Sequence, residues 1–234
     1  MDIHAIFDGL AWLTAALTAV WLRRGFADAF EARWQRPTLS YLAALVIGAS
    51  VGAYGLGSLN IWLAGKSGVA RSIEGALAGG IIAIEFYKWR AGVRGRTAAI
   101  YALPVALGIA VGRIGCFLAG MDDFTYGIPT SLPWGHDFGD GIPRHPVQLY
   151  ETTAMLVFAT AYSVALVRRQ RWVLNNGFAL LVLFYSTQRF ALEALKPYPQ
   201  AVLGLTVFQV ACLGMIIYAL ALLRPKRLPD AQFS

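Results

Sequence analysis

Two arginines and a glutamate interrupt segments of the sequence that are otherwise apolar. Arg113 lies in VGRIGCFLAG, and Arg189 and Glu193 lie in STQRFALEALKP. A spacing of four places Arg189 and Glu193 on one face of a helix. Ionisable groups inside a membrane are costly and commonly functional, and the planar fork of arginine suits phosphate binding. The pattern indicates either a structural ion pair inside a helical bundle or a site that holds a phospholipid headgroup.

A second group of polar residues enters another apolar segment. The stretch PRHPVQLYE contains Arg144, His145, Gln148, Tyr150 and Glu151. Helical spacing predicts that Arg144, Gln148 and Glu151 are neighbours on one face. We interpret the group as a catalytic or headgroup-binding site, and the alternative is a hydrogen-bond network that fixes the preceding loop.

Glu74 and the two cysteines are further candidates. Glu74 begins an apolar segment in RSIEGALAGG, where it either compensates a helix dipole or acts as a buried general base. Cys116 and Cys212 lie far apart in apolar segments, so we expect no structural disulfide. The sequence has no CxxC motif and no His/Cys cluster, so no metal site is expected either. Cys116 is a small apolar filler or, alternatively, a nucleophile.

The elements that must position these residues are membrane-spanning helices. Of the 234 residues, 57% are hydrophobic and 14% are charged, whereas soluble domains carry about 25% charged residues. A helix needs about 20 apolar residues to cross a bilayer. We therefore expect an all-α membrane protein, with residues 1–234 forming one transmembrane domain. The seven candidate spans cover residues 5–22, 40–64, 73–88, 98–119, 146–167, 176–194 and 201–223.

The basic residues indicate the orientation of these spans. Seven spans place fourteen of the twenty Lys and Arg residues on one side and four on the other, while Arg113 and Arg189 fall within spans. Positive charge accumulates in cytoplasmic loops, so the N-terminus is expected outside and the C-terminus inside the cell. The same rule explains the net charge of +7 without a nucleic-acid partner. The fourteen basic residues on the predicted cytoplasmic side are Arg23, Arg24, Arg33, Arg36, Lys88, Arg90, Arg94, Arg96, Arg168, Arg169, Arg171, Arg224, Lys226 and Arg227.

Two other segments have distinctive compositions. Residues 120–145 form the longest hydrophilic stretch, with three prolines and with Asp122 and Asp123 near its start. We expect an ordered outer loop, because long loops in compact proteins are commonly functional. Glycines gather in residues 48–57 and 75–80, which predicts close helix packing.

Several blocks resemble the prolipoprotein diacylglyceryl transferase family. They are GRIGCFLAG, TYGIPTSLPW and RHPVQLYE, followed by QRFALEALKP and GLTVFQVACLGMII near the C-terminus. The GRxGxF and RHPxQLYE blocks are specific when they occur together. The resemblance covers most of the chain in order, from the third candidate span to the seventh.

The resemblance implies an inner-membrane enzyme of seven spans, with its N-terminus and its active site on the outer side. Members of this family transfer a diacylglyceryl group from phosphatidylglycerol to a lipoprotein cysteine thiol, release glycerol phosphate and need no metal or cofactor. By position, we predict catalytic roles for Arg113, Arg189, Glu74, Glu193 and His145. Substrate-binding roles are predicted for Arg144, Gln148, Tyr150, Glu151, Gly120, Tyr126, Gly127, Asp122, Asp123 and Cys116.

The sequence also departs from the family pattern, which reads roughly GRxGNFxNxExxG. Cys116 and Ala119 replace the two asparagines, and Glu74 stands where the family has a histidine. The signature glutamate falls at Met121, or at Asp122 or Asp123 if the loop carries an insertion. These changes suggest a divergent member.

Three functions therefore remain open at the level of sequence. The first is diacylglyceryl transfer from phosphatidylglycerol to a protein thiol. The second is transfer to a glycan or lipid acceptor on the same scaffold. The third is non-enzymatic binding or transport of phospholipid. In each case we expect the chain to act as a monomer, and the general base in either enzyme is Glu74, His145 or one of the loop aspartates.

Overall fold

The computed structural model describes residues 3–30, 38–93 and 98–224. Within these residues the protein is almost entirely helical, and seven of its helices have 16 or more residues. These are α1 (Ile3–Gly25), α2 (Leu39–Leu63), α3 (Ile73–Ala91), α4 (Ala102–Ala119), α5 (Val147–Val167), α7 (Gly177–Leu192) and α8 (Val207–Leu223). The shorter helical elements are η1 (Ala27–Ala29), η2 (Ala99–Tyr101), η3 (Gly120–Asp123), α6 (Arg171–Asn175) and η4 (Glu193–Leu195).

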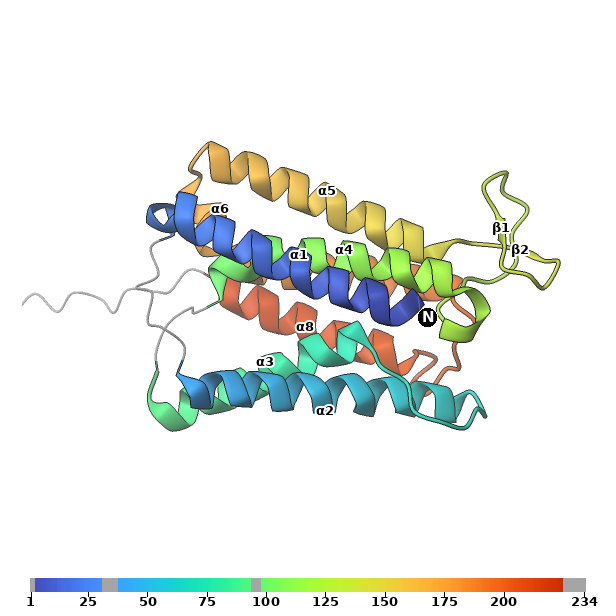
Figure 1. Cartoon of the computed structure of the whole chain (residues 1–234). Coiled ribbons are helices and arrows are strands. Elements are labelled where there is room, and N and C mark those ends of the chain that lie inside the picture. Colours follow the sequence, from blue (N-terminus) through green and yellow to red (C-terminus); the bar gives the residue numbers. More distant parts are fainter. Residues whose placement is uncertain (1–2, 31–37, 94–97, 225–234) are drawn as a thin grey trace, which may run out of the picture.

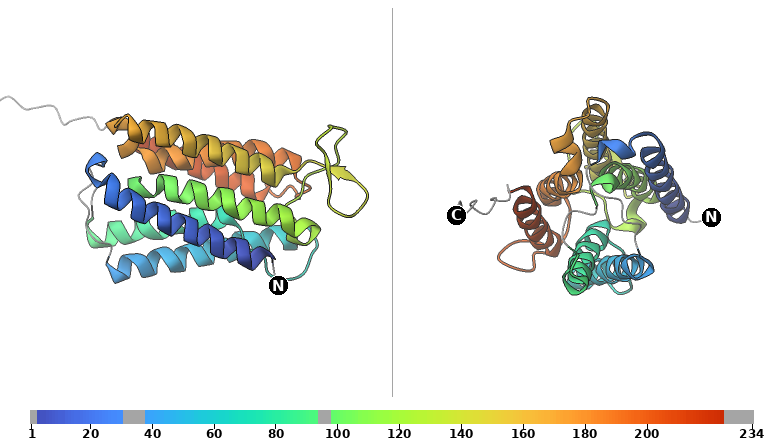
Figure 2. Two further views of the ribbon diagram at one scale, coloured as in Figure 1. Left: turned by 45° about the horizontal axis from the view of Figure 1, so that its top comes forward. Right: turned by 90° about the vertical axis from the view of Figure 1, so that its left-hand side faces the viewer.

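The long helices form an elongated bundle, from one end of which the loop of residues 120–145 projects (Figure 1). Helix α1 packs on α4, α4 on α5, α7 on α8, and α8 touches the α2–α3 pair. The end view in Figure 2 shows α2 and α3 side by side at one edge of the bundle. The apolar core lies between α4, α5, α7 and α8, where Met155, Leu181 and Tyr185 are fully buried.

The described part of the chain contains five helical segments that are long and apolar enough to cross a membrane. They are Ile3–Gly25, Leu39–Leu63, Ala99–Asp123, Val147–Val167 and Gly177–Leu195. Residues of α4 are largely buried within the protein, whereas those of α1 and α2 are mostly exposed. Exposed apolar helices at the edge of a bundle suit contact with lipid. The chain is therefore a multi-pass membrane protein of the all-helical class.

The predicted boundaries agree with the observed helices except at the last span. We expected a helix from residue 201, but α8 begins at Val207. Residues Val202 and Leu205 form an isolated β-bridge, and Gly204 has a φ of +76°, which is incompatible with a right-handed helix. The Thr206 side chain then caps the helix by accepting a hydrogen bond from the Gln209 backbone amide.

The loop of residues 120–145 is ordered by backbone hydrogen bonds, although it contains little regular structure. The strands β1 (His136–Asp137) and β2 (Pro143–Arg144) pair as a short antiparallel hairpin. Closer to the helices, the Gly127 amide donates to the His145 carbonyl at 3.1 Å. The Ile128 amide donates to the Leu195 carbonyl at 2.8 Å, which ties the loop to the end of α7 and η4.

The described basic residues follow the uneven distribution seen in the sequence. Arg23 and Arg24 end α1, Lys88 and Arg90 end α3, and Arg168 caps the C-terminus of α5. All three helices end opposite the 120–145 loop (Figure 1). Six of the fourteen basic residues predicted on this side lie outside the described residues, namely Arg33, Arg36, Arg94, Arg96, Lys226 and Arg227.

Glycines allow α2 and α3 to pack backbone against backbone, as the sequence predicted. A Cβ atom added at Gly52 would overlap the Gly75 carbonyl oxygen, and one added at Gly79 would overlap the Gly48 carbonyl oxygen. An apolar groove of about 810 Å³ runs over this glycine-rich face. The groove is lined mainly by apolar residues of α2 and α3. It exists because the glycines have no side chains to fill it, and it is not a polar site.

Replacing Gly52 should therefore separate α2 from α3. We expect Gly52→Val to destabilise the protein by about 1–3 kcal/mol, the usual cost of overpacking a tight contact. Thermal unfolding of the purified protein in detergent measures the effect. Gly55→Val is the matched control, because it lies on the same helix and its Cβ would meet no atom within 4 Å. Equal unfolding temperatures for the two variants would contradict the packing argument.

Candidate active site

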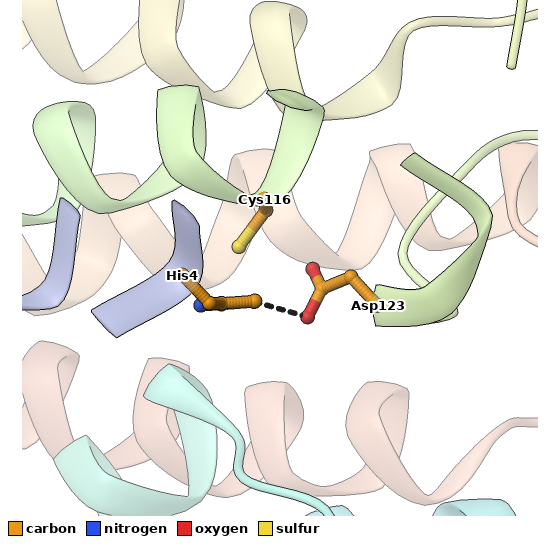
Figure 3. A group of neighbouring side chains, drawn as sticks. All are labelled: His4, Cys116 and Asp123. Carbon is orange, nitrogen blue, oxygen red and sulfur yellow. Dashed lines mark hydrogen bonds and ion pairs between the residues drawn. The ribbon is translucent and has the colours of Figure 1, made fainter. Parts of the chain in front are cut away.

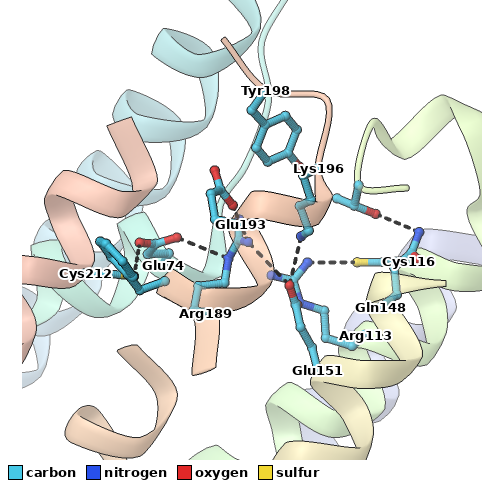
Figure 4. Close-up of polar contacts among 12 residues, drawn as sticks. Glu74, Arg113, Cys116, Gln148, Glu151, Arg189, Glu193, Lys196, Tyr198 and Cys212 are labelled. Atoms are coloured by element: carbon cyan, nitrogen blue, oxygen red, sulfur yellow. Dashed lines mark hydrogen bonds and ion pairs between the residues drawn. The ribbon is translucent and has the colours of Figure 1, made fainter. Parts of the chain in front are cut away.

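Six charged side chains meet in the interior at the end of the bundle that carries the 120–145 loop (Figure 4). Each is at most 6% exposed. They come from α3, α4, α5, α7, η4 and the segment that follows η4. The three cations are Arg113, Arg189 and Lys196, and the three carboxylates are Glu74, Glu151 and Glu193.

Glu151 is the carboxylate that joins the three cations. It lies in the first turns of α5 and is fully buried. One carboxylate oxygen pairs with Arg113 Nε. The other lies 2.8 Å from Lys196 Nζ and 3.5 Å from Arg189 Nη1. Glu151 therefore holds α4, α7 and the segment after η4 together at one point.

Arg189 has the complementary role and joins the three carboxylates. Its Nη1 pairs with Glu193 one turn later, and its Nε lies 3.3 Å from Glu74. Its guanidinium carbon lies 5.1 Å from the centre of the Phe208 ring, a cation–π contact with α8. The same guanidinium reaches Glu151, so α3, α5, η4 and α8 all contact this side chain.

The antiparallel arrangement brings these residues together. Helices α3 and α5 begin at this end of the bundle, which places Glu74 and Glu151 near their starts. Helices α4 and α7 end here, which places Arg113 and Arg189 near their C-terminal ends. Charges buried in a low-dielectric interior are tolerated only when paired, and three cations against three carboxylates leave no formal net charge.

The outcome for Glu74 differs from the capping role considered from sequence. Ser72 caps α3, since its side chain accepts a hydrogen bond from the Gly75 amide. Glu74 instead points inward, where it pairs with Arg189 and accepts a hydrogen bond of 2.9 Å from the Cys212 thiol. A buried carboxylate held between a guanidinium and a thiol remains a candidate for proton transfer.

Lys196 and Tyr185 belong to this site but were missed in the sequence. Lys196 follows the sixth predicted span, residues 176–194, where a lysine is expected at the surface, yet it is buried against Glu151. Burial lowers the pKa of Lys196 to about 8, although the nearby Glu151 favours its charged form. Tyr185 precedes Arg189 by four residues and is fully buried, and its hydroxyl has no hydrogen-bond partner among the described residues. Its helical spacing to Arg189 and Glu193 was the available signal.

The stretch of residues 143–151 divides into two parts in the structure. Gln148 and Glu151 are buried on α5 as expected. Arg144 is not their neighbour, because Pro143 and Pro146 keep the preceding segment extended and α5 begins only at Val147. Arg144 instead pairs with Asp140 at 2.7 Å within the loop.

His145 and Tyr150 form a separate group at the base of the loop. His145 Nδ1 lies 3.3 Å from the Tyr150 hydroxyl, which accepts a hydrogen bond of 2.8 Å from Trp134. The His145 ring contacts Tyr150 and, among the described residues, forms no hydrogen bond or ion pair with the six charged side chains. The predicted catalytic role of His145 thus gains no support from its surroundings.

The remaining predicted residues lie just after the C-terminal end of α4. Gly120 ends the helix with a φ of +67° and a ψ of −133°, a conformation that favours glycine. A Cβ at Gly127 would lie 2.5 Å from the His145 carbonyl oxygen, so only glycine fits this crossing. Tyr126 is buried, and the Arg144 guanidinium lies 5.2 Å from the centre of its ring. Of the two neighbouring aspartates, Asp122 is exposed and Asp123 points inward.

Asp123 meets His4 and Cys116 in a second polar cluster (Figure 3). His4 Nε2 lies 2.5 Å from Asp123 Oδ1. One donor atom from each of the three residues lies within 4.8 Å of the other two, which makes this the one group in the described residues that could hold a metal ion. The sequence gave no such indication, because 112 positions separate His4 from Cys116.

Fold and site together define a class of protein. A helical membrane bundle that buries two arginines beside carboxylates has the charges needed to bind a phospholipid headgroup and to stabilise an anionic leaving group. The model of the family described as "Prolipoprotein diacylglyceryl transferase" matches residues 6–224. The chain belongs to this family, which confirms the predicted resemblance and the class of enzyme, a transferase. The non-enzymatic alternative is not favoured.

Individual relatives agree with the family match. Three of them are named phosphatidylglycerol–prolipoprotein diacylglyceryl transferase. The relative from Nitratidesulfovibrio vulgaris strain Hildenborough is 32% identical over 93% of this chain and 88% of its own length. Those from Solidesulfovibrio magneticus and Vibrio vulnificus strain YJ016 are 28% and 31% identical, over 100% and 92% of this chain and 100% and 84% of theirs. No solved structure shows a significant match.

Removing the charge of Glu151 should destabilise the bundle. Glu151→Gln leaves three buried cations with two carboxylates, and breaking a buried ion pair costs about 3–5 kcal/mol. Thermal unfolding in detergent is the measurement. Asp28→Asn serves as the control, because it removes an exposed ion pair with Arg169 and should change the unfolding temperature little. An unfolding temperature equal to that of the wild type would mean that Glu151 does not hold the site together.

Proposed function

We propose that this protein transfers a diacylglyceryl group from phosphatidylglycerol to the cysteine thiol of a prolipoprotein. The observation that carries the proposal is the meeting of two buried arginines, Arg113 and Arg189, at the shared carboxylate Glu151. The relatives carry this activity in their names. All six charged groups come from one chain, which supports action as a monomer with a single transmembrane domain covering residues 1–234.

The two arginines bind the phosphate of the lipid in this proposal. In the structure both are paired with carboxylates, so an incoming phosphate competes with Glu151 and Glu193 for them. Until the phosphate arrives, the pairing with these carboxylates keeps the guanidinium groups oriented and lowers the free-energy cost of burying them. When the bond between the glycerol carbon and the phosphate oxygen breaks, the arginines stabilise the negative charge that develops on the departing glycerol phosphate.

The acceptor thiol attacks the same glycerol carbon. Its sulfur forms the new thioether bond, and its proton passes to a base. Glu74 is the best-placed candidate among the predicted bases, because it contacts Arg189 directly and is buried away from competing water. Gln148 and Tyr126 line the adjoining end of the loop and are assigned to substrate binding. A glycan or lipid acceptor is not favoured, because the relatives are named for a prolipoprotein acceptor.

We further propose that the chain spans the bacterial inner membrane seven times. Helices α3 and α8 then cross together with the five more apolar segments. The basic ends of α1, α3 and α5 face the cytoplasm, and the N-terminus, the 120–145 loop and the charged site face outward. Lipid therefore enters from the outer leaflet.

The activity is tested with purified protein in nanodiscs. The assay supplies phosphatidylglycerol with labelled acyl chains and a peptide bearing a lipobox cysteine, and mass spectrometry follows peptide and lipids. We expect the peptide to gain a diacylglyceryl group. Arg113→Lys keeps a positive charge but loses the planar guanidinium with its paired N–H donors. The transfer rate should fall by about 10²–10³-fold, the usual effect of removing one oriented hydrogen-bond donor.

Arg169→Ala is the matched control, because Arg169 lies at the opposite end of the bundle in an exposed ion pair. It should leave the rate unchanged. Turnover of phosphatidylglycerol with no change in peptide mass would point to another acceptor. No turnover with any acceptor, by a protein that unfolds like the native form, would overturn the transferase proposal for this chain.

The orientation is tested by labelling single introduced cysteines. Ser131 in the loop and Gln170 after α5 are both exposed and uncharged. A membrane-impermeant maleimide should label Ser131→Cys in intact spheroplasts and should label Gln170→Cys only after permeabilisation. The opposite pattern would invert the topology. Labelling of the unsubstituted protein, whose two native cysteines are buried, measures the background signal.

A further inference from the structure

We propose that His4, Cys116 and Asp123 form a binding site for a zinc ion. They come from the first turn of α1, the end of α4 and η3, three elements that are distant in sequence. Their donor atoms nevertheless converge, as Figure 3 shows, with the sulfur of Cys116 directed toward the gap between the imidazole and the carboxylate. One atom from each residue lies within 4.8 Å of the other two.

The three donors match the chemistry of zinc. Zn²⁺ is bound in proteins by imidazole nitrogen, thiolate sulfur and carboxylate oxygen, and sites that are not purely structural often have three protein ligands with an open fourth position. The side chains of His4 and Asp123 are 22% and 15% exposed, whereas Cys116 is buried. The open position therefore faces the accessible side of the cluster.

The surrounding side chains orient the ligands as a metal site requires. A zinc-bound histidine usually has its other ring nitrogen directed at a carboxylate. Here His4 Nδ1 lies 3.8 Å from Asp8, near enough for an ion pair though too far for a hydrogen bond, and Asp8 also pairs with Arg71 at 3.1 Å. The second oxygen of Asp123 accepts a hydrogen bond of 2.7 Å from Thr125.

Arg113 lies beside the sulfur ligand of the proposed site. Its Nη1 donates to the Cys116 sulfur at 3.8 Å. A thiolate and a carboxylate together neutralise the two charges of the ion, so the site adds no net charge to a poorly solvated region.

The adjustment needed to bind zinc is small. Ligand bonds of about 2.0–2.2 Å in a tetrahedral site place nitrogen and oxygen about 3.3 Å apart. The observed distance between His4 Nε2 and Asp123 Oδ1 is 2.5 Å, so these two atoms must move apart by less than an ångström. Without metal the same contact is a short hydrogen bond between imidazole and carboxylate, and this is the competing explanation that an experiment must exclude.

Cobalt binding provides the direct test. The full-length protein is purified in detergent, freed of its affinity tag, treated with a chelator and titrated with Co²⁺, whose absorption reports a cobalt–thiolate bond. We expect one cobalt ion per chain, a thiolate-to-cobalt charge-transfer band, and displacement of the cobalt by Zn²⁺. His4→Gln should weaken binding by at least about tenfold, the usual minimum even for loss of a supporting contact. Cys116→Ser should abolish the charge-transfer band.

Cys212→Ser is the matched control, because Cys212 is the other buried free cysteine and contacts Glu74 instead. It should leave cobalt binding unchanged. No cobalt–thiolate band in the native protein, or a band that survives Cys116→Ser, would overturn the proposal.

Discussion

The pairing of Glu151 with three buried cations is the interaction on which the rest of this structure depends. A carboxylate without partners is not tolerated in a membrane interior, and neither are two arginines and a lysine. Each charge therefore requires the others, and they come from three helices, α4, α5 and α7, and from the segment after η4. This mutual requirement fixes how far α3, α4, α5 and α7 extend toward the loop end, and it produces a rigid, preorganised charge cluster in a lipid environment.

The scaffold around the cluster has two further constraints. Glycines let α2 and α3 approach until their backbones touch, which brings the first turn of α3, and with it Glu74, against α8. On the other side, the Ile128 amide is bonded to the Leu195 carbonyl, so the 120–145 loop is attached directly to the segment that carries Glu193 and Lys196.

Family membership and departures from the family pattern fall on different parts of the site. The two arginines and the carboxylates on α5 and η4 match the family, and they form the cluster suited to a lipid phosphate. Cys116 stands where the family pattern has an asparagine, and it takes part in the second cluster with His4 and Asp123. Arg113 belongs to α4 one turn before Cys116 and contacts both clusters. Helix α4 thus links the two clusters.

The sequence by itself determined the membrane class, the helix positions and most of the residues of the site, because apolar length, spacing along a helix and a specific set of motifs are all local properties. It did not place Arg144, whose position depends on the prolines beside it, or the start of α8. Tertiary structure alone decided that Lys196 is buried, that Glu74 pairs with Arg189, and that His4 meets Cys116 and Asp123. These contacts join residues far apart in the chain, and they exist only because antiparallel helices end at the same level of the bundle.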